Sequence, residues 1–184
     1  MTYPVFIYGS HVLRKKAVEI DNSFNQLDEF LENMFETMEK SEGVGLAAPQ
    51  VGRSLRVFVV DSTPLAEDDP SLSGFRKAFI NPKILDFSGE DKKYQEGCLS
   101  IPNIREEVNR PEKIKIEYYD QQFQKHVEEY EGTKARIIQH EYDHLEGILF
   151  VDRLNGLKKR LLKSKLQAIS KGKFEVEYKV KLAR

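Results

Sequence analysis

The sequence predicts a single compact domain that mixes α-helices with β-strands. Its 184 residues, of which 40% are hydrophobic, can bury one core and an enclosed site. Segments with helical periodicity are interspersed with β-branched and alternating runs that are typical of strands. No internal repeat, low-complexity tract or change of composition divides the chain, so we assign residues 1–184 to one domain.

The composition argues against several classes of protein. Lys and Arg number 29 against 30 Asp and Glu, so there is no electrostatic reason to expect nucleic acid as the main partner. The single cysteine, Cys98, excludes an intramolecular disulfide and favours a reducing compartment. Residues 1–20 lack signal-peptide architecture, and no apolar run approaches the roughly 20 residues that cross a bilayer. We expect a cytoplasmic protein with no membrane partner.

The first half of the chain predicts a helix, a loop and a strand. In residues 25–40 apolar side chains recur at three- and four-residue steps, which predicts a packing helix. Residues 43–52 are rich in Gly, Ala and Pro, which disfavours regular structure and lets another backbone approach closely; a plain connecting loop is the competing interpretation. The β-branched run 55–61 predicts a buried strand, and the polar residues 62–74 predict a mobile surface loop.

The second half predicts strands followed by two helices. Residues 78–87 predict a strand and residues 88–93 a turn. The alternating segments 109–119 and 125–131 predict a hairpin, after which a helix begins at Gly132-Thr133 and ends near Gly147. Residues 157–170 predict a basic amphipathic helix. Residues 174–182 alternate apolar and charged side chains, which predicts a terminal strand or an extended tail.

The most informative motif is the His-Glu-x-x-His sequence at residues 140–144. On a helix the imidazoles of His140 and His144 lie one turn apart on one face and can hold one metal ion. Glu141 lies beside them and can reach a metal-bound water. The surrounding apolar residues predict that these side chains project into the interior.

Cys98 is the candidate third ligand. A lone free cysteine is usually a small buried hydrophobe, and that interpretation holds for Cys98 considered alone. Considered together with His140 and His144, Cys98 becomes a stronger candidate for a metal ligand. A thiolate with two imidazoles leaves one open position on a divalent transition metal. This ligand set suits iron, nickel, cobalt and zinc alike.

Three motifs stand in order along the chain: Gly43-Val44-Gly45-Leu46-Ala47-Ala48-Pro49-Gln50, Glu96-Gly97-Cys98-Leu99-Ser100 and Gln139-His140-Glu141-Tyr142-Asp143-His144. Their type, order and spacing resemble peptide deformylase, and the resemblance extends to about Leu154. It implies an α+β domain with antiparallel sheets packed around a central metal-binding helix, and a C-terminal helix follows. It also implies a hydrolase that removes the formyl group from the N-terminal formyl-methionine of new proteins and releases formate.

The resemblance also implies a metal centre. Cys98, His140 and His144 are its ligands, and Glu141 is the general base and acid. The implied ion is Fe2+, for which Zn2+, Ni2+ or Co2+ can substitute. A cation held by one thiolate and two neutral imidazoles keeps a formal charge of +1 and can lower the pKa of a bound water.

The remaining motif residues acquire roles in the same way. The resemblance implies that Gln50 and the backbone N–H of Leu99 stabilise the oxyanion. Gly45 pairs with the substrate backbone in the manner of an added strand, and Val44 lines the methionine pocket. We expect Ile137 to form a wall of that pocket.

Two arginines extend these predictions. Glu96 and Arg110 resemble a family pair that braces the cysteine strand by a salt bridge, which we take as a hypothesis. Arg136 stands one turn before His140, where an apolar pocket residue is expected. We expect its methylenes to cover the pocket and its charge to lie at the rim.

Two other functions compete with deformylation. A His-Glu-x-x-His peptidase would take a third His or Glu downstream of the helix, but no histidine follows His144. A non-catalytic module that holds peptide ends would need neither Glu141 nor Gln50. The basic helix at residues 157–170 could add a ribosome contact to catalysis, and binding that is insensitive to salt would contradict that idea.

Overall fold

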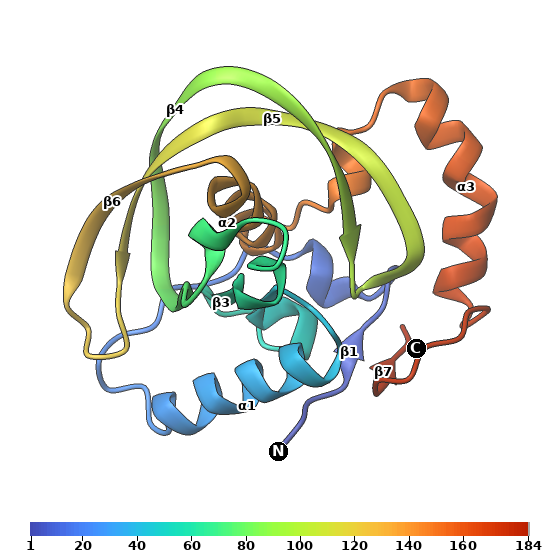
Figure 1. The fold of residues 1–184 in the computed structure, drawn as a ribbon. Coiled ribbons are helices and arrows are strands. Elements are labelled where there is room, and N and C mark those ends of the chain that lie inside the picture. Colours follow the sequence, from blue (N-terminus) through green and yellow to red (C-terminus); the bar gives the residue numbers. More distant parts are fainter. Residues whose placement is uncertain (184) are drawn as a thin grey trace.

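An antiparallel β-sheet curves around one central helix (Figure 1). The computed structural model describes residues 1–183. The sheet has five strands in the order β2-β3-β4-β5-β6, with bounds Gly45–Ala47, Val57–Asp61, Arg76–Cys98, Ile101–Tyr119 and Lys125–Glu131. Helix α2, Gly132–Leu145, lies in the hollow of this sheet. The α+β class and the central helix are therefore confirmed.

The β4–β5 hairpin forms the arch over α2. Its strands are 23 and 19 residues long, and Cys98 pairs with Ile101 across the turn at its end. The pairing register shifts at several points, including Ser88/Asp91, and such bulges bend and twist a hairpin. The turn expected at residues 88–93 is therefore wrong. The polar residues there form an exposed stretch of strand, because pairing with residues 109–113 of β5 continues past the bulge.

Helix α1, Leu27–Lys40, closes the other side of the sheet, as the apolar stripe predicted. Its buried face includes Leu31, Met34 and Met38, which pack with Val57 and Val59 of β3. This cluster supports the short strand β2, which lies within the glycine-rich motif, so the expectation that residues 43–52 lack regular structure is wrong for Gly45–Ala47. The packing therefore fixes one wall of the site described below.

The C-terminal part lies beside the N-terminus (Figure 1). Helix α3, Gly156–Ser170, confirms the predicted basic helix and packs through Leu166 and Ile169. The chain then returns, and β7, Val180–Lys181, pairs in parallel with β1, Val5–Phe6. This pair is an exception to the antiparallel arrangement. Residues 62–74 form two short 3₁₀ turns, Thr63–Leu65 and Pro70–Leu72.

Within residues 1–183, no helix is both long enough and apolar enough to cross a membrane.

Two glycines near the ends of α2 test how tightly this helix is fixed in place. Both have positive φ, +60° at Gly132 and +73° at Gly147. A Cβ at Gly132 would meet nothing within 4 Å, whereas at Gly147 it would lie 2.7 Å from the carbonyl oxygen of Arg14. We expect Gly132→Ala to cost about 1–2 kcal/mol of unfolding free energy from left-handed strain alone. Gly147→Ala should cost about 1–3 kcal/mol more, from the added overlap.

Urea unfolding of both variants beside the unaltered protein measures this difference. Equal losses would mean that the backbone of Arg14 moves freely and that the contact does not hold α2.

Candidate metal centre and active site

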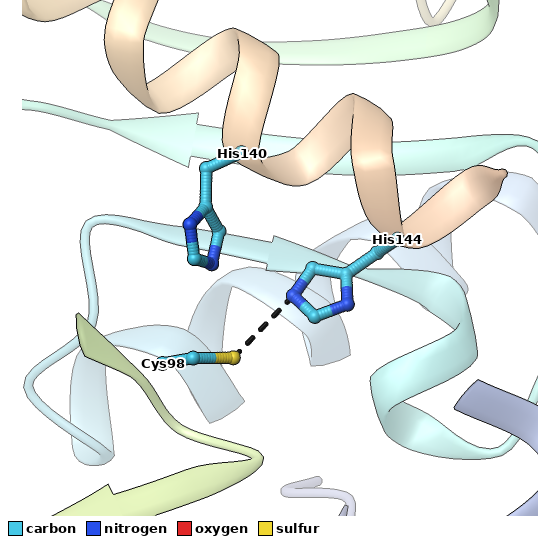
Figure 2. A group of neighbouring side chains, drawn as sticks. All are labelled: Cys98, His140 and His144. Atoms are coloured by element: carbon cyan, nitrogen blue, oxygen red, sulfur yellow. Dashed lines mark hydrogen bonds between the residues drawn. The ribbon is translucent and has the colours of Figure 1, made fainter. Parts of the chain in front are cut away.

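The three predicted ligands converge at the end of the arch. Figure 2 shows His140 and His144 projecting from one face of α2 toward Cys98, which stands at the end of β4. One ligand atom from each residue lies within 4.8 Å of the others. Among residues 1–183 this is the only such group of His, Cys, Asp and Glu. The i, i+4 spacing on α2 places His140 and His144 together, and the β4–β5 turn brings Cys98 next to them.

The donor set suits a divalent transition metal. His140 uses Nδ1 for Glu96, 2.9 Å away, so its Nε2 is left for the metal side. His144 Nε2 lies 3.4 Å from Cys98 Sγ. Burial lowers the pKa of His144 well below its usual value, so its imidazole is neutral, as metal ligation requires. A soft thiolate with two imidazoles is a ligand set for zinc, iron, cobalt or nickel.

A buried ionic network holds this site together. Arg110 reaches Glu96 through two bonds of 2.7 and 2.9 Å, and reaches Asp143 of α2 at 2.8 Å. The Glu96–Arg110 brace expected from the sequence is therefore present. Burial opposes ionisation of Glu96, but hydrogen bonds from His140 and Arg110 outweigh it and hold its pKa below the usual range. Glu96 thus remains ionised and orients His140.

Glu141 occupies a dry position next to the histidines. It is 4% exposed, and its Oε2 has no hydrogen-bond partner among residues 1–183. Burial raises the pKa of Glu141 to about 7. A carboxyl group with such a pKa can both accept and release a proton near neutral pH. Gly45 leaves the space for it, because a Cβ there would lie 2.7 Å from the Glu141 Cδ atom.

A groove of about 650 Å³ opens onto these side chains. It is lined by eight of the nine residues to which the sequence assigned roles, namely Val44, Gly45, Gln50, Cys98, Leu99, Ile137, His140 and Glu141; the ninth, His144, lies behind them. A separate hollow of about 790 Å³, beside Phe75 and Lys77, contains none of them. The chemistry and the groove therefore coincide at one place.

Gln50 and Leu99 face the ligands from the two walls of the groove. The Gln50 Oε1 atom accepts from the Ala47 N–H at 2.8 Å, which turns the amide nitrogen toward Cys98 Sγ, 3.5 Å away. The same nitrogen donates to Ser100 Oγ at 3.2 Å. Leu99 and Ser100 are the two turn residues between β4 and β5. The Gln50 amide nitrogen thus lies close to the thiol.

Arg136 corrects one expectation. Its charge is not at the rim: the guanidinium is buried, contacts Glu96 at 3.0 Å and donates to the carbonyl oxygens of Val108 and Lys92. It also lies over the ring of Tyr94. The cause is Glu96, whose Oε1 atom accepts from both Arg110 and Arg136 and gives the buried guanidinium of Arg136 the charged partner that it requires.

Other site residues had no usable signal in the sequence. On a helix, Asp143 points away from the two histidines. It is nevertheless buried, because Arg110 packs against it on that side of the helix. Val176 and Tyr178 also line the groove, although they are far from every motif. Their alternating pattern indicated an extended segment but not where that segment lies.

Comparison with known proteins identifies the family. The pattern of the family described as polypeptide deformylase matches residues 2–160. The chain belongs to the polypeptide deformylase family. A peptide deformylase of Christiangramia forsetii is 52% identical over 188 aligned residues, which cover 98% of this chain and 96% of that one. A peptide deformylase of Flavobacterium psychrophilum is 49% identical, over 99% of this chain and 97% of the relative.

Solved structures of the family share the fold. The Plasmodium falciparum peptide deformylase in complex with an inhibitor has a TM-score of 0.79 and 35% identity, over 91% of this chain and 99% of its own. A class I type b peptide deformylase of Acinetobacter baumannii, bound to Met-Ala-Ser, has a TM-score of 0.78 and 39% identity. The match covers 84% of this chain and 99% of the relative. Membership makes this chain an enzyme that removes the N-formyl group from nascent peptides, which excludes the purely binding alternative.

The depressed pKa of Glu96 predicts how stability depends on pH. A carboxylate whose pKa is lower in the folded state stabilises the fold above the ordinary glutamate pKa of about 4.3, and this stabilisation is lost as pH falls below it. We expect Glu96→Gln to lower the unfolding free energy by about 3–5 kcal/mol at pH 7, because it removes the buried carboxylate that Arg110 and Arg136 share. The difference should shrink as the pH falls below 4.

Urea unfolding of the chelator-treated proteins at pH 7 and at pH 3.5 to 4 tests this expectation, with Glu107→Gln as an exposed control on β5. The control should stay within about 0.5 kcal/mol. A difference between Glu96→Gln and the unaltered protein that does not change with pH would refute the ionic account.

Proposed function

We propose that this enzyme is a metal-dependent hydrolase that removes the formyl group from an N-terminal formyl-methionine and releases formate, and that residues 1–184 act as one catalytic domain. The observation that carries the proposal is the convergence of Cys98, His140 and His144 beside a buried Glu141 in one groove. A peptidase of the same motif class is the weaker alternative, because here the third ligand is a cysteine in its own motif.

Cys98, His140 and His144 would hold Fe2+, with Zn2+, Ni2+ or Co2+ as substitutes. When bound, such an ion supplies Lewis-acid chemistry to water and to the formyl carbonyl. Glu96 would keep the Nε2 atom of His140 directed at the ion, because it holds Nδ1 at 2.9 Å.

Glu141 performs the proton transfers in this proposal. It accepts a proton from the attacking water, whose oxygen forms a bond to the formyl carbon. The Gln50 amide and the Leu99 N–H donate to the oxyanion that develops, and losing one such donor costs about 3 kcal/mol of transition-state stabilisation. Glu141 then gives the proton to the leaving nitrogen as the C–N bond breaks, so formate and a free amine result. Its raised pKa of about 7 suits both transfers.

The groove would read the peptide backbone and one side chain. The exposed backbone at Val44 and Gly45 pairs with an extended peptide, and Ile137 lines the methionine pocket. Backbone pairing imposes little sequence preference, which suits an enzyme that serves many nascent chains. The Met-Ala-Ser complex of the Acinetobacter relative supports a methionine-led peptide as ligand.

Formate release tests the proposal. The protein is purified without oxygen, loaded with Fe2+ and given a short formyl-methionyl peptide or its acetylated counterpart. We expect formate from the formylated peptide only. Glu141→Gln, which keeps the volume beside Gly45, should lower kcat by about 10²–10⁴-fold while metal content is unchanged.

Glu131→Gln, at the N-terminal end of the same helix, is the matched control, since Glu131 pairs with Lys113 on the surface. If Glu141→Gln remained fully active, the proton transfers would have to be assigned elsewhere. If unblocked peptides were cleaved in place of deformylation, the peptidase alternative would stand.

We also propose that the enzyme acts in the cytoplasm and meets nascent chains at the ribosome through α3. The helix carries five basic and no acidic side chains: Lys158, Lys159, Arg160, Lys163 and Lys165. Its outer face also exposes Leu157 and Leu161 by 62% and 72%. Lys159 and Lys163, one turn apart and both exposed, can contact RNA phosphates.

Cosedimentation with ribosomes at increasing salt measures this contact. We expect binding to fall steeply with salt and to weaken further in Lys159→Glu/Lys163→Glu, with deformylation of a short peptide retained. Lys83→Glu/Lys93→Glu, which makes the same change of charge at exposed positions of β4, is the control. Binding that persists at high salt would contradict an electrostatic contact with RNA.

A further inference from the structure

The C-terminal segment 174–183 is not used by the proposed reaction. It lies outside the residues 2–160 that match the family, and the sequence assigned it no role. The structure nevertheless places two of its side chains, Val176 and Tyr178, on the wall of the catalytic groove.

Anchors on both sides hold these two side chains in place. From residue 174 to 181 the side chains alternate between half-buried and exposed. Phe174 and Val180 pack on the core cluster beneath α3. Val180 is also part of β7, which pairs with β1. The Val5 N–H donates to the Lys179 carbonyl oxygen at 2.8 Å. The segment is thus a strap that is fixed at each end and borders the groove in its middle.

The strap is also bonded to the turn that borders the metal centre. The Tyr178 hydroxyl donates to the Leu99 carbonyl oxygen at 2.8 Å. The other turn residue, Ser100, has its carbonyl bound by the Tyr8 N–H, also at 2.8 Å. The strap and the Leu99 turn therefore form one continuous wall of the groove.

The position of this wall matches the path of a long substrate. Ile137, His140 and Glu141 are buried, so the first residue of a nascent protein enters there while the rest of the chain stays outside. Leu99 and Val176 line the same groove but are half-exposed, so they face the part of it that is open to solvent. An extended peptide advances about 3.3 Å per residue, so the two or three residues after methionine span about 7–10 Å of groove.

We propose that two residues of the strap, Val176 and Tyr178, belong to the substrate groove and contact the peptide residues that follow the formyl-methionine. The inference rests on the proposed deformylation. The surface offered is a valine side chain and a phenol ring without charge. Apolar contacts tolerate varied peptide sequences. The strap should therefore increase the affinity for longer peptides and impose little sequence preference.

Substrates of two lengths test the proposal in the Fe2+-loaded enzyme. Formyl-methionine amide ends before the strap, whereas formyl-Met-Ala-Leu-Ala reaches it. We expect Val176→Ala to lower kcat/KM for the tetrapeptide about 3- to 10-fold more than for the amide, mainly through KM, because it removes binding that is equal in ground and transition state. Glu177→Ala, which faces solvent between the two wall residues, should leave both values unchanged.

A second measurement does not depend on catalysis. In the Zn2+-loaded protein, the Val176 methyl signals should shift on addition of Met-Ala-Leu-Ala and should not shift on addition of methionine amide. Equal losses of kcat/KM on both substrates, or methyl signals that the tetrapeptide leaves in place, would overturn the proposal. Failure of the unaltered enzyme to release formate from either substrate would instead count against the proposed deformylation, and the methyl shifts would still decide whether the strap binds peptide.

Discussion

Arg110 is a fully buried, permanently charged side chain, and the metal centre depends on it. The residue lies on β5, yet it bonds to Glu96 of β4 and Asp143 of α2, so it joins the arch to the helix at the ends that carry Cys98 and His144. A buried guanidinium requires such partners, because its desolvation is otherwise very costly. The same charges that satisfy Arg110 therefore fix the distance between the cysteine strand and the histidine helix.

Glu96 connects this structural network to the chemistry. Its carboxylate receives bonds from Arg110, Arg136 and His140, and this fixes both the ionised state of Glu96 and the ring orientation of His140. Glu141 follows His140 on α2. It is buried, and its Oε2 atom has no hydrogen-bond partner among residues 1–183. The pKa values of Glu96 and Glu141 are thus shifted in opposite directions. The lowered pKa keeps Glu96 ionised so that it orients His140, and the raised pKa suits Glu141 for proton transfer.

The glycine-rich motif and the C-terminal strap define the groove from opposite sides. At Gly45 the missing Cβ allows the carboxyl group of Glu141 to lie against the backbone that is proposed to bind substrate. This close approach explains why a strand that begins with glycine lies beside the catalytic helix. Across the groove, the Leu99 turn is held by Gln50 through Ser100 and by Tyr178, so both walls are linked by side chains to the same turn.

The sequence by itself determined the local features: the histidine pair on one helix face, the amphipathic helices, the strands, and the family through its three motifs. These depend on spacings of a few residues, which propensity and periodicity reveal. Only the tertiary structure decided that residues 88–93 continue a strand, that the guanidinium of Arg136 is buried on Glu96, and that the tail reaches the groove. In each case a partner distant in the sequence supplies the deciding contact: the bent β4–β5 pairing, a carboxylate 40 residues away, and strand β1 at the other end of the chain.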